Sequence, residues 1–188
     1  RMDSAKYARI WEVSIRGARA PETQGLHVAG DSDRIRVFPT GIHVRRYEQT
    51  PVQVLADVRD LLASAKIEGG GAPHRELTEV GFEPHDCIEV TPPSDRHPVR
   101  ITFPGLALGA RLVGYVGIAD VFTRRDNRAP GQLAVEIGGQ TVASVTPGVE
   151  DGWVRFEAAT PPGAHDVTFV VSATTPGKLV CFAAEARE

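Results

Sequence analysis

Trp153 is the residue whose type is best suited to ligand binding, because an indole ring can stack on the apolar face of a sugar ring. It stands at the start of the stretch GWVRFEAAT, residues 152–160. If this stretch is a strand, the side chains of Trp153 and Phe156 point to opposite faces of it. Only one face of such a strand is buried, so one of the two rings should be more exposed than the other. Trp153 can therefore pack in a core, stack on a ligand or contact a partner, and core packing is the first expectation. The same choice is open for three further aromatic residues: Trp11, Tyr47 and Tyr115.

The segment ADVFTRRDNR, residues 119–128, gathers carboxylate, amide and guanidinium groups. Its oxygen-bearing side chains could bind calcium, although they lack the dense spacing of a strong calcium loop, and Asp120 can equally cap a turn. Its basic side chains can bind a carboxylate or phosphate through paired hydrogen bonds. The ordinary alternative is that the segment is a loop exposed to solvent. The oxygen-bearing residues are Asp120, Asp126 and Asn127, and the basic ones are Arg124, Arg125 and Arg128. The predicted ligand contacts are Trp153, Asp120, Arg124 and Tyr115. No cofactor is expected, and a calcium ion at this segment is left open.

Catalytic motifs are missing from the sequence. It carries no nucleophile elbow, phosphate-binding loop or dinucleotide fingerprint. The triplet HDC at residues 85–87 resembles a zinc or thiolate site only superficially, since no second pair of ligands accompanies it. Glu136, Glu150 and Asp151 could be imagined as the carboxylate pair of a glycoside hydrolase, but all three are expected on the solvated surface. Enzymatic activity is left open, with its absence as the expectation.

The two cysteines, Cys87 and Cys181, are 94 positions apart. They can be two buried thiols that act as small hydrophobic residues. Alternatively they form a disulfide between the first and last strands of the C-terminal region, which often lie side by side in antiparallel sandwiches. We predict the disulfide, and with it an oxidising compartment.

Composition indicates a globular chain with many turns. Of the 188 residues, 41% are hydrophobic and 24% charged, and 19 glycines with 14 prolines suit short strands joined by tight turns. The net charge of -3 and the dispersed arginines give no reason to expect nucleic acid as a partner. No segment is long and apolar enough for a membrane-spanning helix, although the chain could be a fragment of a membrane-anchored protein.

Alternating apolar residues and regularly spaced turn signals predict a mainly β protein. The IGGQ step at 137–140 is typical of a two-residue hairpin, because both glycines can take positive φ. Strands are expected within these stretches: 7–18, 25–30, 33–48, 87–93, 99–105, 110–122, 132–145, 152–160, 165–174 and 178–187.

One α-helix is predicted over residues 51–66. Thr50 is a good N-cap, Pro51 suits the first helical position, and apolar residues from Val54 to Ala65 recur at helical spacing. We expect this helix to cover an apolar opening in the sandwich, or else to dock against another chain.

The chain is expected to have three parts. Residues 1–66 would supply N-terminal strands and the helix, packed onto the rest. Residues 67–81, with Gly69, Gly70 and Gly71, read as a linker or loop. Residues 82–188 would form the β-sandwich domain.

The strand VRITFPG, the GIAD step at 117–120, the GW at 152–153 and the CF at 181–182 together resemble jelly-roll modules of the galactose-binding and carbohydrate-binding type. More narrowly, they resemble the extracytoplasmic sandwiches attached to bacterial membrane proteins of glycosyltransferase type. The resemblance covers residues 82–188. It implies an all-β, antiparallel jelly-roll-like sandwich with one accessory helix, placed in the periplasm or on the cell surface.

What the resemblance implies about function is a non-catalytic module that binds a glycan or supports an attached envelope protein. Two alternatives remain: a protein–protein interaction component of an envelope assembly without a small ligand, and the extracytoplasmic domain of a glycosyltransferase or hydrolase. Fold alone does not decide among them.

Overall fold

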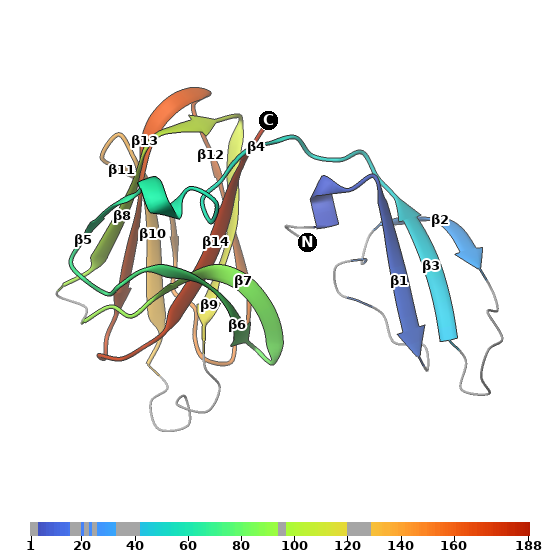
Figure 1. The fold of residues 1–188 in the computed structure, drawn as a ribbon, viewed down its shortest axis with the longest axis horizontal. Coiled ribbons are helices and arrows are strands. Elements are labelled where there is room, and N and C mark those ends of the chain that lie inside the picture. Colours follow the sequence, from blue (N-terminus) through green and yellow to red (C-terminus); the bar gives the residue numbers. More distant parts are fainter. Residues whose placement is uncertain are drawn as a thin grey trace. The chain divides into compact units, whose positions relative to one another are not determined.

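The computed structural model describes residues 4–15, 20, 23, 26–32, 42–93, 97–119 and 129–188. The chain divides into two compact units, Arg1–Gln53 and Val54–Glu188. In the described residues of each unit the strands form antiparallel sheets, as Figure 1 shows. The predicted all-β class is confirmed.

Strands β7 to β14 form a jelly roll, an eight-stranded sandwich of two antiparallel sheets. One sheet has the order β12-β9-β14-β7 and the other the order β11-β10-β13-β8. The Ile137–Gln140 pair closes a hairpin over Gly138 and Gly139, both with positive φ, which confirms the predicted turn. The bounds are β7 Glu83–Val90, β8 Val99–Leu108, β9 Arg111–Ile118, β10 Gly131–Ile137, β11 Gln140–Val145, β12 Val154–Ala159, β13 Gly163–Ala173 and β14 Val180–Arg187.

Three shorter strands extend these sheets. β4 (Val54–Asp57) pairs with the end of β14, and β6 (His74–Val80) pairs with β7 at the edge of what becomes a six-stranded sheet. β5 (Lys66–Glu68) pairs with β8 at the edge of the five-stranded sheet.

The main core lies between the two sheets. Phe103 and Phe169 from the five-stranded sheet meet edge to face, and Phe169 also stacks on Phe182 of β14. Aliphatic side chains from both sheets fill the remaining space, so the alternating apolar residues of these strands serve to pack the two sheets against each other. Among them are Ile88, Val90, Ile101, Leu112, Val116, Leu133, Val135 and Val171.

The predicted helix over 51–66 is wrong. Residues 54–57 form β4, the chain then turns, and only the short 3₁₀-helix η3 (Leu62–Ser64) follows before β5. Val58 inserts into the main core, and its N–H donates to the carbonyl of Ala184. Hydrogen bonding to β14 and burial of Val58 stabilise this segment more than a helix would. Tertiary packing here overrides a weak helical pattern.

The expected division of the chain also differs from the structure. Residues 54–66, expected to belong to the N-terminal part, instead supply β4 and the start of β5 to the sandwich. Residues 67–81, expected to be a linker, contain β6. The sandwich unit therefore begins at Val54 rather than near residue 82.

The N-terminal unit is a sheet of its own with the order β1-β3-β2, preceded by the 3₁₀-turn η1 (Ser4–Lys6). Its strands are β1 Arg9–Ile15, β2 His27–Ser32 and β3 Ile42–Glu48. The buried carboxylate of Glu12 accepts hydrogen bonds from the hydroxyls of Thr23 at 2.8 Å and Tyr47 at 2.7 Å, and Arg45 lies 3.4 Å away. These bonds satisfy a charge that would otherwise be costly to bury.

Candidate functional site

Trp153 lies just before β12 and stacks on two rings of the protein. The ring of His85, from β7, is 4.6 Å away between centroids and 15° from parallel. The ring of Tyr115, from β9, is 5.9 Å away and 8° from parallel. His85 and Tyr115 are 68 and 38 positions from Trp153 in the sequence, yet all three rings meet in one stack. The stacking stabilises the fold in addition to the burial of apolar surface.

The stack covers a second, smaller core on the outward side of the six-stranded sheet. Val80, Cys87, Ala119 and Cys181 are buried there, and Trp153 packs against them. The strand β14 explains how this core arises, because Val180 and Phe182 point into the main core while Cys181 points to the opposite side. Trp153 is half-buried and helps to close this second core.

The predicted Cys87–Cys181 disulfide is confirmed, and it lies within the second core. It joins β7 and β14, which are paired neighbours. Both cysteines are buried, so Cys87 is not available as a nucleophile or metal ligand.

The turn between β6 and β7 is anchored close to Trp153. Val80 pairs with Glu83, and Gly81 and Phe82 form the two-residue turn between them, with φ of 62° and 71°. A Cβ atom on Gly81 would lie 2.9 Å from the Cα of Gly152, the residue before Trp153. Gly81 and Gly152 therefore contact each other through their backbones, and the ring of Phe82 projects from this point with 80% of its surface exposed.

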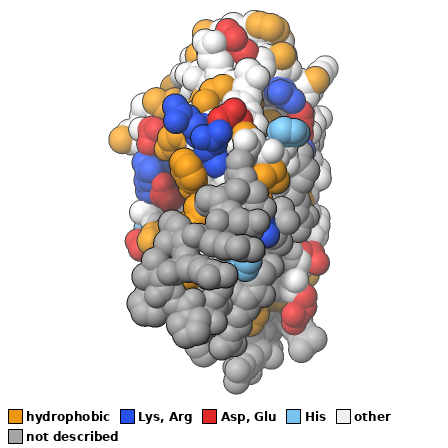
Figure 2. Space-filling model, turned by 90° about the vertical axis from the view of Figure 1, so that its right-hand side faces the viewer, with side chains coloured by type: hydrophobic (Ala, Val, Ile, Leu, Met, Phe, Trp, Pro, Cys, Tyr) orange, Lys and Arg blue, Asp and Glu red, His pale blue; other side chains and the backbone are white. Residues whose placement is uncertain are grey.

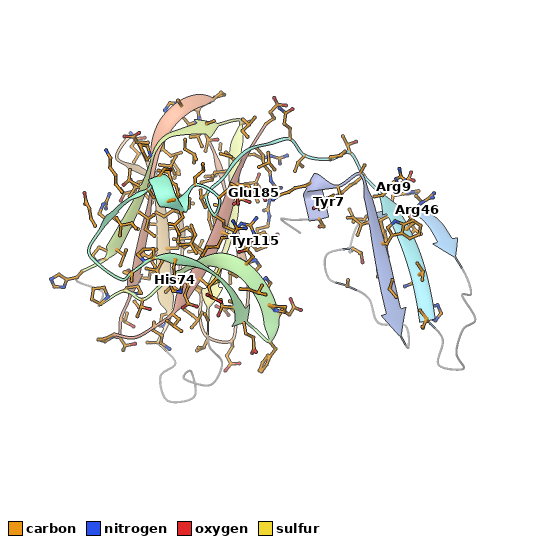
Figure 3. The ribbon with its side chains drawn as sticks, in the orientation of Figure 1. Tyr7, Arg9, Arg46, His74, Tyr115 and Glu185 are labelled. Atoms are coloured by element: carbon orange, nitrogen blue, oxygen red, sulfur yellow. A yellow bond between two sulfur atoms is a disulfide. The ribbon has the colours of Figure 1, made fainter. Side chains whose placement is uncertain are left out.

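We call Phe82, His85, Tyr115 and Trp153 the aromatic end. Tyr115 and the buried Glu185 project from the neighbouring strands β9 and β14, as Figure 3 shows. At this end Val80 also forms an isolated bridge with Ala119. Ala119, which directly precedes the segment 120–128 in the sequence, therefore lies beside the aromatic end.

Two of the four predicted ligand contacts, Trp153 and Tyr115, are thus brought together by the fold. The other two, Asp120 and Arg124, lie outside the described residues, as do Asp126 and Asn127 of the considered calcium site. Within the part of the chain that the structure describes, no group of three or more His, Cys, Asp or Glu residues is arranged to hold a metal ion.

Carboxylates near the site are held in ion pairs. Arg75 donates two hydrogen bonds to Asp86, at 2.9 and 2.7 Å, and one to Asp60 at 2.6 Å. The hydrogen bonds from Arg75 lower the pKa of Asp86 below its usual range. Arg59 pairs with Asp57 and donates to the carbonyl of Asp86 at 3.1 Å. This network fastens the segment after β4 to the β6–β7 hairpin.

The three carboxylates considered for hydrolysis do not form a matched pair facing a cleft. Glu136 of β10 is paired with Arg100 at 2.5 Å on the five-stranded sheet. Glu150 and Asp151 lie in the turn before β12, where Asp151 accepts a hydrogen bond from the N–H of Gly148 at 2.7 Å.

A second exposed aromatic residue belongs to the N-terminal sheet. Trp11 of β1 is 59% exposed, and the guanidinium carbon of Arg46, its cross-strand partner, lies 6.0 Å from the ring centroid. Figure 2 shows hydrophobic and basic side chains adjoining one another on one face of the molecule. In β1 the usual burial of apolar residues and exposure of polar ones is reversed. Trp11 and Val13 are exposed, whereas Glu12 and Ser14 are buried.

Sequence reasoning missed Phe82 and His85 as residues of the site. The strand before Gly81 is exposed at most positions and shows no apolar alternation, so together with the preceding glycine run it favoured a linker interpretation. The His85–Trp153 contact has no local signal, since it joins separate strands.

The fold is a β-sandwich like those of carbohydrate-binding modules. The CBM51 module of Clostridium perfringens GH95, solved with methyl-galactose, has a TM-score of 0.50 and 13% identity over 70% of this chain and 99% of that chain. The CBM51-2 and INT domains of C. perfringens ZmpB give a TM-score of 0.53 and 14% identity over 93% of this chain and 40% of that one. The M60 catalytic domain with CBM51-1 and CBM51-2 of the same protein gives 0.53 and 12% over 88% and 20%.

Comparison of the sequence with known proteins gives less information than comparison of the fold. No model of a known protein family matches the chain. An apulose-4-phosphate transketolase subunit of Actinobacillus succinogenes is 25% identical over 108 residues, which are 55% of this chain and 38% of that protein. In the described parts of the chain, no helix has the length and apolar character needed to cross a membrane.

Proposed function

We propose that the unit Val54–Glu188 is a non-catalytic carbohydrate-binding module that takes a saccharide at the aromatic end. The observation that carries the proposal is the likeness of fold to a CBM51 module over 99% of that module. The second support is chemical: the aromatic end combines exposed ring surface with polar groups, which suits the mixed apolar and hydroxylated surface of a sugar.

The proposed contacts take different parts in binding. Trp153 would meet the ligand through its exposed portion, because its stacking contacts are already made with His85 and Tyr115. Tyr115 is buried and would hold Trp153 in place. Asp120 and Arg124, in the segment after Ala119, would hydrogen-bond sugar hydroxyls.

The proposed setting is an extracytoplasmic accessory module of a larger bacterial envelope protein, including one of glycosyltransferase type. A disulfide between buried cysteines favours an oxidising compartment. The similar CBM51 modules of ZmpB, seen beside an M60 catalytic domain, support an accessory role.

The test is a glycan array probed with the oxidised 188-residue chain, followed by calorimetric titration of the saccharides that bind. Arg124→Ala should weaken binding several-fold. Lys66→Ala, which removes a positive charge from the five-stranded sheet, is the matched control and should leave binding unchanged. Absence of binding to every saccharide on the array would refute the proposal.

The second candidate function is interaction with a partner chain without a small ligand. The exposed apolar face of β1, with Trp11 59% and Val13 68% exposed, favours it. A chain that binds no glycan but self-associates in sedimentation velocity, and loses that association in Trp11→Ser, would support this alternative.

A further inference from the structure

The turn that carries Phe82 is strained in a way that Phe does not ordinarily tolerate. Two-residue hairpins with positive φ at both central positions are type I′ turns, which favour Gly, Asn and Asp. Gly81 fits this requirement, but Phe82 at φ 71° is a bulky residue in the left-handed region. Such a conformation costs about 1–2 kcal/mol for a residue with a Cβ atom.

Packing within the described chain does not offset this cost. The Phe82 ring is 80% exposed, so it gains little from burial. The turn geometry is imposed instead by the backbone contact of Gly81 with Gly152 and by the β6–β7 ladder. A strained backbone that presents an exposed ring is a feature of binding sites rather than of folding cores.

The groups around the turn define what the ring could bind. Glu83 follows Phe82 and is exposed, while Glu150 and Asp151 precede the Gly152 that contacts Gly81. Among the described residues, the charged groups that adjoin the turn, either next to Phe82 in sequence or just before the Gly152 that contacts Gly81, are thus these three carboxylates, which accept hydrogen bonds from hydroxyls and repel anions.

We propose that Phe82 is the ring on which the saccharide stacks, and that the ligand is a neutral pyranose with a continuous C–H face. This inference rests on the proposed carbohydrate-binding function and assigns its stacking surface to Phe82 rather than to Trp153. Trp153 holds the hairpin in place by stacking on His85 of β7, and the flanking carboxylates accept hydrogen bonds from the sugar hydroxyls.

Phe82→Asn separates binding from folding. Asn tolerates positive φ, so the variant should have an unchanged or higher melting temperature than the wild type. Loss of one stacked ring should weaken binding about three- to tenfold. Leu77→Thr is the matched control, because Leu77 is an exposed apolar residue on the same hairpin, 67% exposed on β6, and its removal should leave binding unchanged.

The probes are methyl galactoside, methyl glucoside and methyl N-acetylglucosaminide, with methyl glucuronide as the anionic comparison, titrated into the full chain by calorimetry. Weaker binding of the neutral glycosides to a folded Phe82→Asn variant supports the inference. Unchanged binding by that variant, or preference for the glucuronide, overturns it and leaves the carbohydrate-binding function standing. A lower melting temperature of Phe82→Asn also overturns it, since the ring would then serve the fold. If the wild type binds none of the probes and nothing on the array, the proposed function fails and the inference with it.

Discussion

Reduction of the Cys87–Cys181 disulfide should lower the free energy of unfolding by about 4–5 kcal/mol. The bond closes a loop between residues 94 positions apart, and the loop-entropy relation gives about 4.7 kcal/mol at 25 °C for that length. Urea unfolding of the oxidised and the reduced chain, followed by far-UV circular dichroism, measures the difference. With a slope of about 2 kcal/mol per molar urea, the midpoint should fall by about 2 M.

The double variant Cys87→Ala with Cys181→Ala is the control for side effects of the reductant. It should lose at least as much stability as the reduced chain, because it also removes two buried sulfur atoms from the second core. A reduced chain with the midpoint of the oxidised one would refute the reasoning, since the unfolded ensemble would then gain nothing when the loop is opened.

Three further outcomes follow from individual contacts. The folded-state pKa of Asp86 lies below its unfolded value because Arg75 hydrogen-bonds the carboxylate, so its stabilisation is present above about pH 4 and is lost as the pH falls through the lowered pKa. Asp86→Asn should flatten the pH dependence of the unfolding free energy in the acidic range below about pH 5, and an equally steep pH dependence in both proteins, measured by urea unfolding at several pH values, would contradict this. Gly114→Ala places a Cβ 2.2 Å from the Phe156 ring and should cost about 1–3 kcal/mol or more in thermal unfolding, whereas an unchanged melting temperature would show that the strands can separate there. Trp153→Ala should cost about 2–4 kcal/mol, and a fully stable variant would show that the indole does not close the second core.

The sandwich strands were readable from the sequence because their burial alternates. In β10 the buried positions are Gly131, Leu133, Val135 and Ile137, and the intervening residues are more exposed. The antiparallel packing of such strands also made the disulfide foreseeable, since Cys87 and Cys181 fall on strands near the two ends of the jelly roll.

The incorrect predictions, the helix over 51–66 and the linker over 67–81, concern segments that lack this alternation. β6 is the edge strand HRELTEV, exposed at five of its seven positions, so it shows no apolar face and was mistaken for part of a linker. Residues 54–65 have an apolar pattern that a helix and a strand followed by a turn satisfy equally well. The choice depends on whether β14 offers an edge for pairing, which no local pattern reveals.

The aromatic end shows why residue type alone did not single out Phe82 as the proposed stacking ring. Trp is the better stacking residue, but Trp153 is engaged by His85 and Tyr115, whereas Phe82 is held outward by a backbone that would be more stable with Asn. The β6–β7 hairpin that carries Phe82 is fastened by the disulfide at Cys87. Any loss of binding in Trp153→Ala or in the reduced chain therefore combines a loss of hairpin support with any loss of direct contact, whereas a substitution at Phe82, which leaves the second core intact, reports on the proposed contact between that ring and a saccharide.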